Sequence, residues 1–208
     1  MSGAIIVFAK APVARAAKTR LIPVLGADGA ARLHERLIRR ALDIAQAACP
    51  GAIELCCAPD ATHLFFSGIG GVALTEQGTG DLGARMHRAL ARALRAAERA
   101  VLIGADCPAL TPAYLREAIH ALEEADVVLG PAADGGYVLV GARRVAPALF
   151  DGIAWGGSRV LDEQRACLRA LGWRWSELAT LWDVDRPEDL ERVRRELADG
   201  PALLSGLA

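Results

Sequence analysis

Short apolar runs alternate with longer amphipathic or alanine-rich stretches along nearly the whole chain. The runs that predict strands are 4–9, 53–58, 72–75, 100–105, 127–130, 137–141 and 173–178. The stretches that predict helices are 28–49, 81–99, one that begins at 112, 158–171 and 187–197. Strands that alternate with helices predict an α/β fold with a mostly parallel sheet and helices on both faces. For 208 residues we expect a single domain, residues 1–198, followed by a C-terminal tail at 199–208.

Three of the predicted helices begin with local signals. Thr111 can cap a helix whose first position is Pro112, and Ser158 can cap the helix that follows it. Pro187 begins the last helix, and acidic residues in the first turn suit the positive end of the helix dipole.

The composition argues against several functional classes. With 25 acidic and 24 basic residues the chain has no basic excess, so we expect no nucleic-acid partner. No apolar run approaches the roughly 20 residues of a membrane span. The run 4–9 is too short for a signal peptide, so we expect a cytoplasmic protein without membrane association. The five cysteines have no CxxC spacing, and we expect neither disulfides nor a zinc site.

The only two lysines, Lys10 and Lys18, lie in one segment after the first predicted strand, together with Arg15 and Arg20. Elsewhere the chain uses arginine, so the lysines indicate a place that needs a compact, mobile ammonium. A loop with four cations is suited to bind phosphates. In an extended segment Arg20 would point to the same side as Lys18. The alternative is a solvated loop whose lysines are close by chance.

Several carboxylates follow predicted strands. Asp106 ends one strand, Asp134 follows the next, and Asp183 and Asp185 precede the last helix. Because ligands bind beyond the C-terminal ends of strands in open parallel sheets, we expect these side chains to converge near Lys10. Carboxylates hold hard cations such as Mg²⁺ or Mn²⁺, which neutralise a di- or triphosphate together with lysine and arginine. The pattern therefore predicts a metal-dependent transfer reaction that uses a di- or triphosphate.

Each of these carboxylates also has a purely structural explanation. Asp106 can form an Asx turn before Pro108, and Asp134 can belong to a hairpin turn. We favour a function for Asp106 and Asp185, because both end strands and both precede helices.

Other catalytic sets are not visible in the sequence. There is no Ser/His/Asp arrangement and no activated cysteine. The histidines at 34, 63, 87 and 120 fall on predicted helices or at their edges, and we interpret them as structural or facing solvent.

Residues 78–83 match the dinucleotide-binding pattern GxGxxG. The match lies mid-chain rather than after the first strand, and the acidic residue about 20 positions on, Glu98, is inside or ending a helix. Asp81 also places a negative charge where a pyrophosphate would bind. We therefore interpret the segment as a helix start, with Arg85 one turn in and facing the cleft, rather than as an NAD site.

Seven segments occur in the order found in one bacterial family. They are FAKAP (8–12), KTRL (18–21), GDLGARM (80–86), GADCPALT (104–111), GP (130–131), DGGY (134–137) and DVDRPEDL (183–190). Over about residues 5–190 the chain resembles a glycosyltransferase-like family, also described as radical-SAM/selenodomain-associated transferases, of the nucleotide-diphospho-sugar transferase superfamily. That superfamily includes phospholactate and molybdenum-cofactor guanylyltransferases and CMP-sugar synthetases.

The resemblance implies a glycosyltransferase-A-type fold, in which Asp106 and Asp185 resemble the two metal aspartates of the superfamily. We accordingly expect Mg²⁺ or Mn²⁺ at Asp106 and Asp185. The residues expected to bind the nucleotide are Lys10, Arg15, Lys18, Arg20, Gly80, Asp81 and Arg85. The residues expected to act in catalysis are Lys18, Asp106 and Asp134. The residues expected on the acceptor side are Gly135, Gly136, Tyr137 and Trp155.

The first loop departs from the family pattern, which is roughly Pro-x-Pro-Gly-Arg-x-Lys-Thr-Arg-Leu. Arg15 stands where the family has glycine, and Ala16 stands where it has arginine. A glycine at that place lets backbone amides approach a phosphate. The departure therefore bears directly on nucleotide binding.

Two hypotheses remain open from the sequence. In the first, the protein is a metal-dependent transferase that uses a nucleotide or nucleotide-sugar and a small-molecule acceptor, by nucleotidyl or glycosyl transfer. In the second, it is a non-catalytic nucleotide-binding or partner-binding module that has lost part of its phosphate loop. The four aspartates argue against loss of function, because a dead site has no reason to keep them together. The base or sugar, the acceptor and the oligomeric state are left open.

Overall fold

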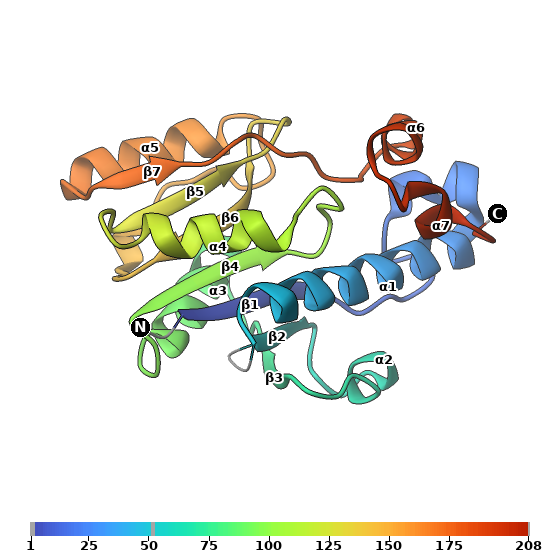
Figure 1. Cartoon of the computed structure of the whole chain (residues 1–208), viewed down its shortest axis with the longest axis horizontal. Coiled ribbons are helices and arrows are strands. Elements are labelled where there is room, and N and C mark those ends of the chain that lie inside the picture. Colours follow the sequence, from blue (N-terminus) through green and yellow to red (C-terminus); the bar gives the residue numbers. More distant parts are fainter. Residues whose placement is uncertain (1–2, 51–52, 208) are drawn as a thin grey trace.

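The computed structural model describes residues 3–50 and 53–207. Its centre is a seven-stranded sheet with the strand order β3-β2-β1-β4-β6-β5-β7 (Figure 1). The strands are β1 (Gly3–Lys10), β2 (Ile53–Ala58), β3 (Ala73–Glu76), β4 (Arg99–Gly104), β5 (Val127–Pro131), β6 (Tyr137–Ala142) and β7 (Trp175–Glu177). β6 pairs antiparallel with β4 and β5, and the other pairs are parallel. The predicted single-domain α/β fold with a mostly parallel sheet is confirmed.

The helices follow the strands in the predicted alternation. They are η1 (Thr19–Leu21), α1 (Ile22–Ala48), α2 (Leu64–Ser67), α3 (Leu82–Ala93), α4 (Pro112–Ala121), η2 (Pro147–Leu149), α5 (Val160–Leu171), α6 (Pro187–Glu196) and α7 (Gly200–Leu204). At the start of α4 the hydroxyl of Thr111 accepts a hydrogen bond from the N–H of Tyr114 at 3.1 Å, which confirms the predicted cap.

Several helix boundaries differ from the prediction, among them the end of α3, which lies at Ala93 rather than at residue 99. α1 begins at Ile22 rather than at residue 28, because the helix continues across a kink at Gly26. Gly26 has a φ of 68° and a ψ of 169°, a backbone conformation that glycine adopts readily. α5 begins after Arg159 without a side-chain cap, so the predicted cap by Ser158 is wrong. The backbone of Ser158 instead packs so closely on Gly135 that a Cβ there would meet the Ser158 carbonyl oxygen at 2.0 Å.

Successive residues of β1 face opposite layers of helices. Ile5 and Val7 pack into a buried cluster with side chains of α1 and α4, and Ile6 and Phe8 pack into another with side chains of α3 and α5. This alternation follows from the period of two along a strand. The sheet is therefore covered on both faces, and its polar groups gather at the strand ends.

The C-terminal segment 200–207 is attached to α1 by hydrogen bonds and apolar contacts. Arg36 Nη1 donates to the carbonyl oxygens of Leu203 at 2.8 Å and of Ser205 at 2.7 Å, and Arg32 Nη2 donates to that of Leu207 at 3.1 Å. Leu203 and Leu207 are buried in a third apolar cluster with α1 and α6. The expected boundary at residue 198 stays a prediction, and the segment predicted as a tail contains α7.

None of the helices in the described residues is long and apolar enough to cross a membrane.

Candidate functional site

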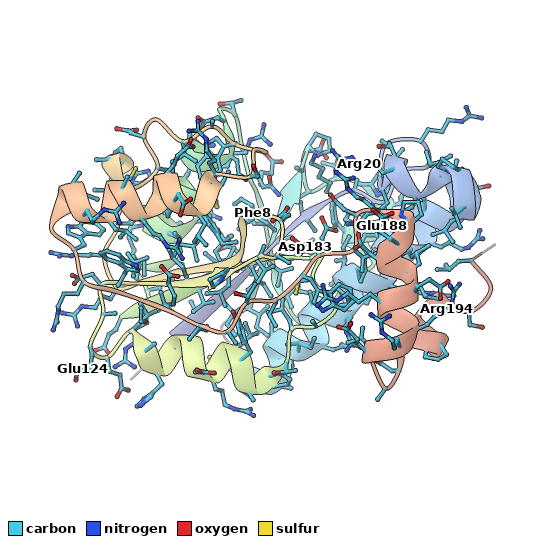
Figure 2. The ribbon with its side chains drawn as sticks, turned by 90° about the horizontal axis from the view of Figure 1, so that it is seen from above. Phe8, Arg20, Glu124, Asp183, Glu188 and Arg194 are labelled. Atoms are coloured by element: carbon cyan, nitrogen blue, oxygen red, sulfur yellow. The ribbon has the colours of Figure 1, made fainter. Side chains whose placement is uncertain are left out.

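A pocket of about 520 Å³ opens where β1 and β4 end. Its wall contains five of the predicted site residues, namely Lys10, Lys18, Arg20, Asp106 and Asp185. The remaining lining residues are Phe8, Ala9, Ala16, Ala17, Thr19, His34, Gln77, Leu82, Gly104 and Ala105. Figure 2 shows Phe8, Asp183 and Arg20 in this part of the molecule, and Glu124 at the opposite end.

Lys18 is the central cation of the pocket. Its Nζ lies 2.8 Å from Asp106 Oδ1 and 3.1 Å from Asp185 Oδ1, and it donates to the Val184 carbonyl oxygen at 2.6 Å. The side chain is only 3% exposed. Burial disfavours the ammonium, but Asp106 and Asp185 outweigh it and raise the pKa of Lys18 above its ordinary value. Lys18 is therefore charged and holds the two carboxylates together.

Asp106 follows β4 and presents its two oxygens differently. Oδ1 is buried against Lys18, while 43% of the side chain is exposed, which leaves Oδ2 as the oxygen toward the pocket. Burial opposes ionisation, but the charge of Lys18 and a contact with His34 hold the pKa of Asp106 well below its ordinary value. Asp106 is thus an anion at neutral pH, as a metal ligand must be.

His34 reaches the pocket from α1. Its Nε2 lies 3.1 Å from the carbonyl oxygen of Lys10, which can only accept, so Nε2 carries the proton of that hydrogen bond. Its Nδ1 lies 3.4 Å from Asp106 Oδ1. His34 is buried beside Asp106 and does not face solvent, while the interpretation of it as a structural residue stays a prediction.

Asp183 adds a further carboxylate to this group. Burial is the largest cause that raises its pKa, to about 7, and Asp106, Asp134 and Asp185 raise it further while Lys18 lowers it. This mutual influence means that the four aspartates are near enough to repel one another. With a pKa of about 7, Asp183 is only about half ionised at neutral pH.

The backbone after Lys18 is not extended. Thr19–Leu21 form η1, and Arg20 Nη1 lies 3.5 Å from Asp185 Oδ2 with its side chain 65% exposed. The prediction of an extended segment here is wrong, because the chain turns directly into α1. Both Lys18 and Arg20 nevertheless reach Asp185, from the buried and the exposed side.

The first loop keeps a backbone shape that usually needs glycine. Arg15, which stands where the family has glycine, has a φ of 68°. L-residues with a side chain adopt this left-handed region rarely and at a cost. Arg15 does not line the pocket. Arg15 therefore adopts a conformation that glycine would adopt more readily, and its side chain lies outside the pocket.

Gln77 was not singled out by the sequence, yet it lines the pocket on the β3 side. It is 5% exposed, and its Nε2 donates to the carbonyl oxygens of Cys56 at 3.1 Å and Ala9 at 3.4 Å. Because carbonyl oxygens only accept, the amide orientation is fixed and Oε1 is the atom left for the pocket. Arg88 holds the same segment by donating to the Gln77 carbonyl oxygen at 2.8 Å.

The other predicted site residues do not line this pocket. Asp81 caps α3 by accepting from the Ala84 N–H at 2.8 Å, and Arg85 Nε donates to the Gly80 carbonyl oxygen at 2.9 Å. Asp134 Oδ1 accepts from the Gly136 N–H at 3.0 Å in a turn.

The predicted acceptor-side aromatic residues pack against each other. The rings of Tyr137 and Trp155 meet edge to face with centroids 6.3 Å apart. The Tyr137 hydroxyl donates to Gln164 Oε1 at 3.1 Å, and burial raises the pKa of Tyr137 well above its ordinary value. Their roles stay predictions.

The candidate metal ligands Asp106 and Asp185 lie in the pocket, but the side chain of Lys18 contacts both. Within residues 3–50 and 53–207, no group of three or more His, Cys, Asp or Glu side chains is arranged to hold a metal ion. Asp106 and Asp185 both line the pocket, with the Lys18 ammonium in contact with each. Carboxylate oxygens are the donors that Mg²⁺ and Mn²⁺ prefer. The donor set therefore fits a hard cation once the ammonium is displaced.

Comparison with known proteins points to one family. The model of the family described as "Uncharacterized protein conserved in bacteria (DUF2064)" matches residues 41–157. The crystal structure of a proposed nucleotide-diphospho-sugar transferase from Desulfovibrio desulfuricans G20 is 30% identical, with a TM-score of 0.87 over 98% of this chain and 94% of that chain. No curated protein matches the chain.

More distant structures share the fold. Glucosyl-3-phosphoglycerate synthase from Mycobacterium tuberculosis, in complex with Mn²⁺, UDP and glucosyl-3-phosphoglycerate, is 13% identical, with a TM-score of 0.55 over 98% of this chain and 80% of that chain. CMP:2-keto-3-deoxy-manno-octonic acid synthetase complexed with CTP is 15% identical, with a TM-score of 0.53 over 93% of this chain and 97% of that chain. Both share the fold of this chain.

Proposed function

The chain belongs to the bacterial family DUF2064, and we propose that it is a metal-dependent transferase that uses a nucleotide or nucleotide-sugar and a small-molecule acceptor. The observation that carries the proposal is the contact of Lys18 with both Asp106 and Asp185 in one pocket. The buried ammonium compensates the charge of two carboxylates at strand ends. Such a charged cluster indicates a binding site rather than a part of the apolar core.

In this proposal Asp106 and Asp185 hold the divalent cation, with Asp183 and Asp134 adding negative potential around it. The bound cation supplies charge neutralisation at the phosphates and the leaving group. Lys10 and Arg20 are exposed at the rim, where they attract and orient the phosphates. Mg²⁺ and Mn²⁺ are both candidates, and Mn²⁺ accompanies UDP in the glucosyl-3-phosphoglycerate synthase.

The nucleoside fits best on the side of β3. Gln77 bonds to residues of β1 and β2 and lies across the pocket from Asp106, which follows β4 on the other side of β1. Neighbouring strands are about 4.8 Å apart, so this span suits a nucleoside whose phosphates reach the carboxylate side. The Oε1 of Gln77 would then accept a hydrogen bond from the base or the ribose.

Both nucleotidyl and glycosyl transfer agree with this arrangement. The cationic loop favours a triphosphate donor, since a diphosphate needs fewer cations. CMP:2-keto-3-deoxy-manno-octonic acid synthetase holds CTP, while the glucosyl-3-phosphoglycerate synthase holds UDP, on the same fold. An association with radical-SAM or selenium-related proteins stays a prediction.

The alternative, a non-catalytic nucleotide-binding or partner-binding module, rests on the altered first loop. Arg15 adopts the left-handed conformation itself, which supports a loop of retained shape despite the missing glycine. The clustered aspartates also carry a mutual repulsion that a mere packing role would not need. We therefore favour the transferase.

Thermal-shift titration with nucleoside triphosphates and nucleotide-sugars, with and without Mn²⁺, tests the proposal. A ligand that binds the folded state raises the melting temperature by mass action. Asp106→Asn should lose the metal-dependent part of the shift, and the matched control Asp43→Asn, on α1 outside the pocket, should keep it. With the best donor, release of pyrophosphate indicates nucleotidyl transfer and release of a nucleoside diphosphate indicates glycosyl transfer. If no donor shifts the wild type with or without Mn²⁺, the proposal is wrong.

A further inference from the structure

The ammonium of Lys18 is already surrounded by oxygen atoms of the protein. An ammonium carries three N–H groups. The three oxygens within 3.1 Å of Nζ are Asp106 Oδ1, the Val184 carbonyl oxygen and Asp185 Oδ1. With its side chain 3% exposed, Lys18 as it stands cannot bind a phosphate in the pocket.

The same ammonium also stands in the way of a metal ion. A cation held by Asp106 and Asp185 would lie against the position now taken by Nζ, and two positive centres at such a distance repel strongly. Although Asp106 Oδ2 is open to the pocket, the ammonium and a divalent cation therefore compete for the charge of the same two carboxylates.

We propose that Lys18 is an internal counter-ion that occupies the place of the divalent cation and exchanges with it. The cation takes over Asp106 and Asp185, and the released ammonium moves to the phosphates of the nucleotide. This inference rests on the proposed function and adds to it a coupling between the two ligands.

The side chain is suited to such an exchange. Lysine has a flexible four-carbon stem and a point charge, whereas an arginine fork is tied to planar partners. Lys18 already lines the pocket next to Thr19 and Arg20, so a change of side-chain rotamer brings Nζ toward it. The backbone at Lys18, with φ of 48° and ψ of 43°, is set by the turn into η1 and need not move.

The exchange makes metal and nucleotide binding cooperative. The metal releases Lys18 for the phosphates, and the nucleotide draws Lys18 away from the carboxylates. By linkage each ligand strengthens the other by the same factor. Removing the ammonium should abolish this source of coupling while it frees the carboxylates for the metal.

Calorimetric titration of Mn²⁺ into the wild type, Lys18→Met and the control Arg39→Met, a cation of α1 outside the pocket, tests the exchange. We expect Lys18→Met to bind Mn²⁺ alone at least about fivefold more tightly than the wild type, a coupling of ordinary size. Arg39→Met, which removes a solvent-screened charge 53% exposed beside Glu35, should stay within about twofold. UDP or CTP should tighten Mn²⁺ binding more in the wild type than in Lys18→Met. Equal or weaker Mn²⁺ binding by Lys18→Met overturns the exchange.

A second measurement needs no variant of Lys18. Because the chain has only two lysines, labelling lysine Cε with carbon-13 gives two NMR signals, which Lys10→Arg assigns. Saturating Mg²⁺ with UDP or CTP should shift the Lys18 signal and expose its ammonium protons to solvent exchange. If calorimetry shows that the protein binds Mg²⁺ but the Lys18 signal does not shift, the exchange is wrong. The proposed function is not contradicted by that result. If the wild type binds neither metal even with these nucleotides, both proposals fail.

Discussion

His34 links Asp106 to the end of β1, with its Nδ1 3.4 Å from Asp106 Oδ1 and its Nε2 3.1 Å from the Lys10 carbonyl oxygen. His34→Leu keeps the apolar volume but leaves the Lys10 carbonyl oxygen without this partner. We expect it to lower the free energy of unfolding by about 1–3 kcal/mol, the cost of an unpaired buried polar group. Urea unfolding measures the change. His34→Gln, which can still donate to the Lys10 carbonyl oxygen, should recover part of it, and a His34→Leu variant as stable as wild type contradicts the assignment.

We expect Arg15 to destabilise the folded protein, because its backbone adopts a left-handed conformation. At a φ of 68° a side chain costs roughly 1 kcal/mol, so Arg15→Gly should stabilise the protein by up to about that amount. Gly172 supplies the matched control, since it caps α5 with φ of 64° and ψ of 27° and a Cβ there meets nothing within 4 Å. Gly172→Ala should therefore destabilise by about 1 kcal/mol. Thermal unfolding of both variants should give shifts of opposite sign; shifts of the same sign would contradict a strained Arg15.

Gln77 should contribute to binding of the nucleoside but not of the phosphates. Gln77→Met keeps the length of the side chain and removes Oε1, so affinity for UDP or CTP should fall by about 0.5–1.5 kcal/mol, one neutral hydrogen bond. Binding of inorganic pyrophosphate with Mn²⁺ should stay unchanged. Calorimetry with both probes separates the two effects. A parallel loss for pyrophosphate would mean that the variant disturbs the whole pocket, through the carbonyl oxygens of Ala9 and Cys56.

Asp126 should stabilise the fold at neutral pH and lose this effect in acid. Its Oδ2 accepts from the Arg174 N–H at 3.0 Å and from Arg144 Nη2 at 2.8 Å. Burial opposes ionisation, but these partners lower the pKa of Asp126 in the folded state. A lowered folded pKa gives stability that is present above the unfolded value of about 3.9 and lost as the pH falls through the folded value.

The comparison of Asp126→Asn with wild type at two pH values checks this sign. The variant should be less stable by about 1–2 kcal/mol at pH 7, and the difference should shrink near pH 3. Asp162→Asn, whose side chain is 74% exposed beside Arg165, should change stability by less than about 1 kcal/mol at either pH. A deficit of Asp126→Asn that is independent of pH would assign the effect to packing.

Much of the fold was predictable because its signals are local. The strand predicted at 53–58 is β2, and Thr111 caps α4 as its position before Pro112 indicates. The convergence of Asp106 and Asp185 followed from their places at strand ends, since the C-terminal ends of parallel strands share one edge. The start of α1 was not predictable, because Gly26 interrupts its periodic pattern while tertiary packing continues the helix.

The residues that the sequence missed depend on distant partners. His34 is one of many buried positions on α1, and nothing near it in sequence indicates that it meets Asp106. Gln77 is oriented by carbonyl oxygens 68 and 21 residues away. The occupation of Asp106 and Asp185 by Lys18 was equally hidden, since clustering of lysines indicates a site but not which partner holds them.

The attachment of the C-terminal segment to α1 has a practical consequence. Arg32 and Arg36 donate hydrogen bonds to the carbonyl oxygens of Leu207 and Leu203, and they flank His34 on α1. Shortening the chain after Asp199, or fusing an affinity tag there, therefore loosens the support of a residue beside Asp106. If such an alteration abolishes activity, the result does not show that the deleted residues take part in catalysis.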